Sequence, residues 1–166
     1  MSAKLAASLA PGGAHHFLAQ LAGDWAGTAR TWFEPGELGD ESPVRGSIRL
    51  ALDGRVAVHE YTSSLAGEPF AGIALHAYDL AEDRFVTAWA DSFHNGTAIM
   101  FSEGHAGGWP AGCSVLGSYP DGQRGPRWGW RTEITQPEPG QLMLRHFNIP
   151  PGLEESIAVE FNYRRV

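Results

Sequence analysis

Most of this chain alternates between short strand-like runs and turn signals, and this alternation limits the folds it can adopt. Residues 54–96 show it most clearly. The runs Phe70–Tyr78 and Phe85–Phe93 are dense in aromatic and β-branched residues, and turn formers at 67–69 and 79–83 bound them. Such runs between turns are typical of antiparallel strands.

The same pattern continues on both sides of this stretch, from residue 23 to the end. Asp53-Gly54 and Asn95-Gly96 are typical of two-residue hairpin turns. The sequence therefore predicts ten strands joined in order by tight turns. They are expected at Asp24–Phe33, Val44–Leu52, Arg55–Ser64, Phe70–Tyr78, Phe85–Phe93, Thr97–His105, Cys113–Tyr119, Arg127–Thr135, Gln141–Ile149 and Ser156–Arg165.

A meander of ten strands has two exposed edges, and closing the sheet on itself removes both. We therefore predict an all-β fold, a ten-stranded antiparallel up-and-down β-barrel. A barrel of this size has room for a small ligand as well as side chains. A sandwich of two sheets is the alternative, but it needs longer crossover connections than the sequence offers.

The beginning of the chain differs from the rest. We expect a flexible N-terminal segment at 1–13 and a single β-barrel domain at 14–166, since this length suits one domain. Phe17, Leu18 and Leu21 share one face of a short helix at 14–21. Such a helix is too short to be stable alone, so we expect it to close one end of the barrel. The adjacent His15 and His16 are expected to be solvated.

Charge and cysteine content bound the partners and the compartment. The net charge is −7 and no Lys/Arg cluster precedes the terminal Arg164-Arg165, which argues against a nucleic-acid partner. The single Cys113 indicates a reducing compartment, and we expect a cytoplasmic protein. Only Lys4 accompanies the short apolar run at 5–10, so we expect neither a secretion signal nor a membrane span.

Strand alternation predicts several inward faces. In the last strand, Ile157, Val159, Phe161, Tyr163 and Arg165 lie opposite a largely polar face, and Trp128, Trp130, Thr132 and Ile134 share a face of the eighth strand. The third to sixth strands are ambiguous. In a closed barrel the two ends of the sheet meet. We therefore expect the Arg165 guanidinium to lie over the Trp25 indole, in a structural role.

Several segments together resemble a known family. They are LAGDW at 21–25, DGRVAVHEY at 53–61, GEPFAGIALHAYDLAEDRFVTAWADS at 67–92, GTAIMFSEG at 96–104 and PGLEESIAVEFNYRR at 151–165. The pattern resembles DUF1579, a bacterial family of uncharacterised proteins, over nearly the whole chain. The Gly-x-Trp at 23–25 with a late arginine also looks like the calycin superfamily, which includes the lipocalins. The resemblance implies a lipocalin-like barrel and brings no catalytic residue.

A more distant likeness is to haem-binding barrels of the nitrobindin type, which share the short N-terminal plug and the Gly-x-Trp opening. Those proteins ligate iron through a histidine of a late strand. The likeness implies haem as a cofactor and His146 as its axial ligand.

Candidates for ligand contact gather in the middle strands. Asp91 could bind a ligand beside Trp89, or be a buried carboxylate paired with an arginine such as Arg131. His59 and Glu60 are neighbours, so only one of them enters the lumen. The side chains predicted to line a ligand pocket are Glu60, His76, Trp89, Asp91, Trp130, His146 and Tyr163.

No motif fixes a reaction. The histidine spacing does not predict a metal site, and no nucleophile motif is present. The sequence leaves enzyme activity undecided and favours a non-enzymatic role, the binding of a small, largely apolar molecule in the lumen. Three alternatives stay open. They are a haem barrel, a hydrolase or isomerase using Asp91 with a histidine, and a structural barrel with a filled lumen that forms a homodimer.

Overall fold

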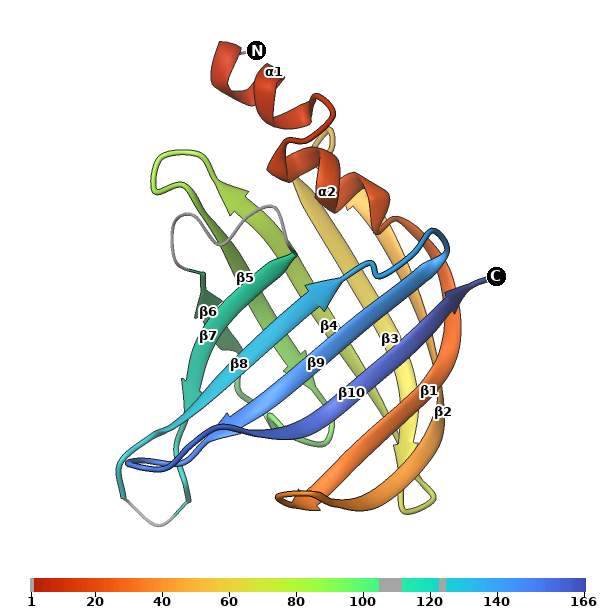
Figure 1. The fold of residues 1–166 in the computed structure, drawn as a ribbon, viewed down its shortest axis with the longest axis vertical. Helices are drawn as coiled ribbons and strands as arrows, with labels where there is room; N and C mark the ends of the chain where they lie inside the picture. The colour runs from red at the N-terminus through yellow and green to blue at the C-terminus, as the bar shows by residue number, and fades with distance from the viewer. Residues whose placement is uncertain (1, 105–111, 123–124) are drawn as a thin grey trace.

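The barrel is closed. The structure, a computed structural model, describes residues 2–104, 112–122 and 125–166. Across these residues ten antiparallel strands follow one another, and β1 pairs with both β2 and β10, which confirms the predicted up-and-down barrel (Figure 1). The strands are β1 (Gly23–Glu34), β2 (Glu37–Ala51), β3 (Val56–Leu65), β4 (Glu68–Asp79), β5 (Arg84–Asp91), β6 (Met100–Glu103), β7 (Cys113–Tyr119), β8 (Trp128–Thr135), β9 (Gln141–Ile149) and β10 (Ser156–Arg165).

The expected contact between the first and last strands is present. Trp25 lies opposite Arg165 in the β1–β10 register, and the Arg165 Cζ atom stands 4.3 Å from the centre of the Trp25 ring. The same guanidinium donates hydrogen bonds to the carbonyl oxygens of Ala22 (2.5 Å) and Gln20 (2.9 Å). Arg165 therefore ties the last strand to the segment that leads into the first.

Two helices precede the barrel. The segment expected to be flexible contains α1 (Ala3–Leu9), whose N-cap Ser2 accepts a hydrogen bond from the Leu5 amide. A serine cap before an alanine- and leucine-rich run favours a helix. The prediction that His15 is solvated is wrong, since its ring is buried with Nδ1 2.7 Å from the Ser8 hydroxyl. No helix in the described ranges is long and apolar enough to cross a membrane.

The second helix, α2 (Ala14–Gln20), covers one end of the barrel, as predicted (Figure 1). Phe17, Leu18 and Leu21 are buried, and the Phe17 ring meets the Phe85 ring at the start of β5 edge-on. The Trp25 Nε1 atom donates to the Leu21 carbonyl oxygen at 2.9 Å. The apolar stripe of a very short helix is thus stabilised by packing on the barrel rather than by helix propensity.

Two strands begin three or more residues away from their predicted starts. β2 begins at Glu37 instead of Val44, because β1 continues to pair with it through two irregularities after Thr31. β6 begins at Met100 instead of Thr97, and residues 92–99 form a loop between β5 and β6. The predicted end of this strand at His105 lies outside the described residues.

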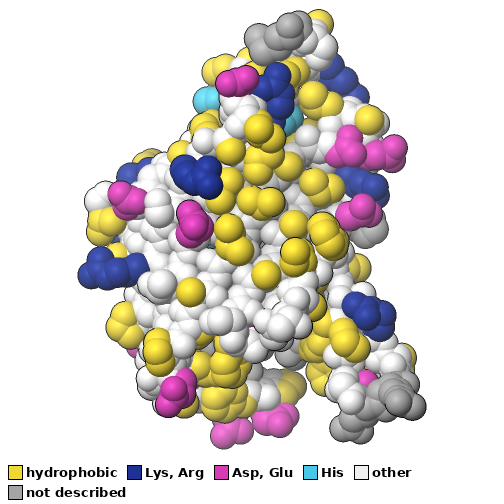
Figure 2. Space-filling view, turned by 180° about the vertical axis from the view of Figure 1, so that it is seen from behind, with side chains coloured by type: hydrophobic (Ala, Val, Ile, Leu, Met, Phe, Trp, Pro, Cys, Tyr) yellow, Lys and Arg dark blue, Asp and Glu magenta, His cyan; other side chains and the backbone are white. Residues whose placement is uncertain are grey.

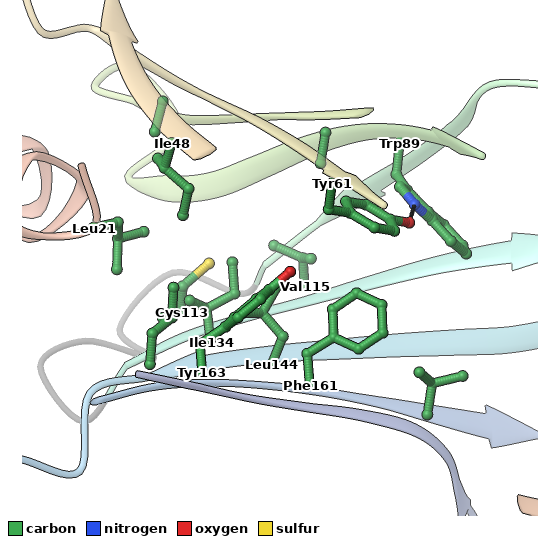
Figure 3. Close-up of a cluster of buried hydrophobic side chains, with 14 of the residues drawn as sticks. Leu21, Ile48, Tyr61, Trp89, Cys113, Val115, Ile134, Leu144, Phe161 and Tyr163 are labelled. Carbon is green, nitrogen blue, oxygen red and sulfur yellow. Dashed lines mark hydrogen bonds between the residues drawn. The ribbon is translucent and has the colours of Figure 1, made fainter. Parts of the chain in front are cut away.

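Side chains fill the interior. The predicted inner face of β8 is confirmed for Trp130, Thr132 and Ile134, which are buried. Figure 3 shows core side chains from opposite sides of the barrel pointing toward one another, with Tyr61 hydrogen-bonded to Trp89. The Trp89 Nε1 atom donates to the Tyr61 hydroxyl at 2.8 Å.

The outer surface is not uniformly polar. Ile73 and Leu75 of β4 and Phe101 of β6 are exposed on the outside of the barrel. In the register, Leu75 lies opposite Ala88 and Ala88 opposite Phe101, so an apolar row crosses three strands. Figure 2 shows hydrophobic side chains gathered over the middle of the rear face.

Candidate functional site

Three histidines lie inside the barrel, His59 on β3, His76 on β4 and His146 on β9, and all three are buried. The Thr87 hydroxyl is 2.9 Å from His76 Nδ1, and the Thr132 hydroxyl is 2.9 Å from His146 Nδ1. Strand alternation explains the arrangement. Alternate side chains of each strand point into the barrel, and on β3, β4 and β9 one of these inward side chains is a histidine that lines the same cavity.

The lumen holds these histidines neutral. Burial lowers the pKa of His59 to about 3, that of His76 to about 4 and that of His146 to about 3. Repulsion from His76 and His146 adds to the pKa shift of His59, and repulsion from His94 and His76 adds to that of His146. Among the residues that the structure describes, no three His, Cys, Asp or Glu side chains are arranged to hold a metal ion.

The cavity beside the histidines is small. Its volume is about 20 Å³, close to what one water molecule needs. His59 Nδ1 and His76 Nε2 lack a hydrogen-bond partner among the described residues. The lining consists of His59, Tyr61, Ala74, His76, Thr87, Trp89, Ser102, Thr132, Leu144, His146 and Phe161. This cavity is too small for an organic ligand.

The surroundings of His146 do not fit a haem. Its ring stacks with Trp89 at 5.7 Å and with Trp130 at 5.5 Å between ring centres, and its Nδ1 atom faces Thr132. The adjoining cavity is far too small for a macrocycle.

A larger pocket opens at the other end of the barrel from α2. We call it the mouth pocket, and its volume is about 360 Å³. It lies where β5, β7 and β9 end and where β6 and β8 begin, whereas α2 packs at the start of β5. Its lining consists of Trp89, His94, Asn95, Ala98, Ile99, Met100, Ser118, Tyr119, Pro120, Arg127, Trp130 and Asn148. Trp89 lines both this pocket and the small cavity beside the histidines, which is called the closed cavity below.

The mouth pocket combines apolar walls with a few polar groups. Trp89 and Trp130 stack at 5.5 Å with their planes 12° apart. Trp130 Nε1 and Asn95 Oδ1 are buried and have no partner in the described part of the chain. Arg127 lies at the pocket with its guanidinium bonded to the hydroxyl (2.9 Å) and the carbonyl oxygen (2.6 Å) of Ser118. Residues that carry a donor, an acceptor and a cation thus line one pocket with two indoles.

Asp91 organises the loop that carries His94. Its Oδ1 atom accepts from the backbone amides of Phe93 (3.1 Å), His94 (2.5 Å) and Asn95 (3.0 Å). Its Oδ2 atom accepts from His94 Nδ1 at 2.5 Å, and its side chain has no exposed area. Burial by itself raises the pKa of Asp91. The hydrogen bond from the His94 side chain, the positive charge of that ring when it is protonated and the hydrogen bonds from the backbone amides outweigh burial, and they hold the pKa of Asp91 below its ordinary value.

The pairing of Asp91 with Arg131 is wrong. Arg131 lies on the outward face of β8 and binds Glu133 and Glu155 instead. Adjacent positions of a strand point to opposite sides, and the buried Trp130 and Thr132 on either side leave Arg131 facing out.

The predicted pocket residues separate into several places. His76 and His146 line the closed cavity, Trp130 lines the mouth pocket, and Trp89 lines both. Asp91 is the last residue of β5, and its side chain is hydrogen-bonded to His94 in the loop that follows. Tyr163 is buried, with its hydroxyl 3.3 Å from His59 Nε2 and its ring near Trp25.

The prediction that Glu60 lines the lumen is wrong. Its side chain is 61% exposed and faces Arg49 at 3.9 Å on the outside of the barrel. The inward phase of β3 runs through Ala57, His59 and Tyr61, which are all buried.

The residues that sequence reasoning missed are of two kinds. His59 was identifiable, because the large Tyr61 and Leu65 two and six positions on mark its face as the inner one. His94, Asn95 and Arg127 lie outside the strands, where no periodic signal indicates direction.

These features define a class of protein, a small closed β-barrel with buried histidines inside and a pocket of ligand size at one end. A comparison with models of protein families matches residues 10–165 to the family described as protein of unknown function (DUF1579). The chain belongs to this family, as its motifs predicted. A comparison with curated proteins found no match.

Proposed function

We propose that the protein reversibly binds a small, planar, largely apolar molecule in the mouth pocket. The observation that carries this proposal is the pocket itself. Its volume of about 360 Å³ is in the usual range of small-molecule sites, and it is lined by Trp130, whose buried Nε1 has no partner among the described residues. We expected binding in the lumen, but the cavity beside the histidines has only about 20 Å³, and we therefore propose the mouth pocket instead.

The lining indicates how such a molecule is held. Its flat apolar surface lies against the indoles of Trp89 and Trp130, where burial contributes about 25 cal/mol per Å² before ordering costs. An acceptor on the ligand accepts a hydrogen bond from the Trp130 N–H, and Arg127 favours a negative charge at the rim. A planar aromatic anion suits the two indoles, the Trp130 N–H and the Arg127 guanidinium.

The test is titration with 1-anilinonaphthalene-8-sulfonate, a planar aromatic anion that fluoresces in apolar surroundings. Trp130→Phe keeps a ring and removes the N–H, so we expect about fivefold weaker binding, equivalent to about 1 kcal/mol. Ala98→Trp fills the pocket from its lining and is expected to abolish binding.

Trp32→Phe is the matched control, because Trp32 on β1 does not line the mouth pocket. It is expected to bind the dye like the unaltered protein. Dye binding that ignores both Trp130→Phe and Ala98→Trp would place the site elsewhere and overturn the proposal.

A further inference from the structure

We propose that His94, positioned by Asp91, is a general base that removes a proton from the molecule bound in the mouth pocket. The protein would then catalyse proton transfer on a small planar substrate. This inference rests on the proposed function and adds a reaction to it. Four observations carry it, and they concern the proton, the position of the base, the developing charge and the other histidines.

The first observation is the state of the imidazole. Because His94 Nδ1 donates to the Asp91 carboxylate at 2.5 Å, the neutral ring carries its lone pair on Nε2. Three backbone amides fix the carboxylate from its other oxygen. The buried negative charge also stabilises the imidazolium that forms when Nε2 takes a proton. Asp91 is therefore a positioning residue and His94 the catalytic one.

The second observation is location. The His94 side chain is 23% exposed and lines the mouth pocket. Its ring centre lies 5.9 Å from that of Trp89 and 6.3 Å from that of Trp130. A planar molecule lying against the two indoles therefore presents its edge or face to the base, as general base catalysis requires.

The third observation concerns the charge left on the substrate. Trp130 and Arg127 line the same pocket, and Trp130 Nε1 has no hydrogen-bond partner in the part of the chain that the structure describes. Both stabilise an anion as it develops. The substrate class that fits is a planar molecule with an acidic C–H next to an electron-withdrawing group, whose conjugate base holds its charge on oxygen or nitrogen.

The fourth observation is that other groups are unsuited to this task. His59, His76 and His146 lie around the closed cavity, and burial opposes their protonation. Cys113 is buried, and burial raises the pKa of its thiol to about 12. Among the described residues that line the mouth pocket, His94 is the one histidine.

The test uses 5-nitrobenzisoxazole, a small planar probe with one acidic C–H. His94 Nε2 takes that proton, the C–H electron pair becomes the second π bond of a nitrile, and the ring N–O bond breaks. The phenoxide oxygen leaves with the negative charge, and the imidazolium then returns its proton to water. The coloured nitrophenoxide product is measured by absorbance, and binding is measured separately by competition with the dye.

We expect saturable turnover about 10²- to 10⁴-fold faster than with the same concentration of free imidazole. His94→Ala is expected to lose this acceleration while still binding the probe, and added imidazole is expected to restore part of it. A purely structural role for His94 would give no such rescue. Asp91→Asn is expected to lower the rate constant. The control His16→Ala, on α2 at the far end, is expected to leave the rate unchanged.

Two outcomes separate this inference from the proposal beneath it. If the probe binds but reacts no faster than with imidazole, or if His94→Ala keeps the full rate, the inference falls and the binding proposal stands. If the probe and the dye both fail to bind, the binding proposal falls and the inference falls with it.

Discussion

At the scale of the residue, the adjacent arginines Arg164 and Arg165 are expected to contribute very differently to the stability of the fold. Arg165 stacks on Trp25 and donates to two carbonyl oxygens at the end of α2. Its neighbour Arg164 forms an exposed ion pair with Glu138. An exposed ion pair such as that of Arg164 contributes about 0–1 kcal/mol to stability. The hydrogen bonds and the cation–π contact of Arg165 each contribute to stability, and we expect their contributions to add.

We therefore expect Arg165→Met to lower the free energy of unfolding by about 2–3 kcal/mol. The adjacent Arg164→Met is the matched control and is expected to cost less than about 1 kcal/mol. Urea denaturation of both variants measures the difference. Equal losses would show that the contact between Arg165 and Trp25 has no special role.

At the scale of the element, the β3–β4 hairpin carries local strain. Its two turn residues, Ala66 and Gly67, have φ angles of 49° and 84°. A two-residue turn with positive φ at both positions favours Asn-Gly, since a non-glycine residue other than Asn or Asp pays a steric cost there. The exposed Ala66 pays that cost in this hairpin.

Ala66→Asn is accordingly expected to raise the free energy of unfolding by about 0.5–1 kcal/mol. Ala81→Asn, in the exposed β4–β5 turn at a residue without positive φ, is the control and is expected to change little. Thermal or urea unfolding checks both. A loss of stability in Ala66→Asn would contradict the turn assignment.

The elements were largely predictable because turn chemistry and alternation are local. Trp130, Thr132 and Ile134 alternate with polar residues, so their face was clear from the sequence. β3 was less clear, because both of its faces carry apolar residues, Val56 and Val58 on one and Tyr61 and Leu65 on the other. The mouth pocket was beyond prediction. Several of its polar groups come from loop positions 94–95 and from residue 127 just before β8, and its volume depends on how distant side chains pack.

At the scale of the whole molecule, the interior of the barrel contains three buried histidines, His59, His76 and His146. In the unfolded chain these histidines take up protons near pH 6.5, but in the folded barrel they do so only near pH 3 to 4. Between these values the unfolded state binds more protons. The free energy of unfolding therefore falls as the pH falls through this window.

Each such histidine contributes up to about 1.4 kcal/mol per pH unit, so the three together contribute about 4. We expect acid unfolding before the pH reaches the folded-state pKa values. His146→Gln is expected to reduce the slope by about 1.4 kcal/mol per pH unit below pH 6. Urea unfolding at a series of pH values measures it.

Leu144→Val is the matched control for this experiment. Leu144 lines the same closed cavity and does not titrate, so its loss is expected to lower stability equally at every pH. A slope that is the same in His146→Gln and Leu144→Val would mean that His146 already binds its proton in the folded barrel.

Closure through β1 and β10 also sets the order of events during synthesis. Seven residue pairs join these two strands, and β10 is the last strand to be made. Until β10 has been synthesised, β1 and β9 each have an unpaired edge that can pair with a neighbouring chain. The ribosome must therefore deliver nearly the entire barrel before the ring can shut, and a chain that stops short of residue 156 would keep both edges available for aggregation.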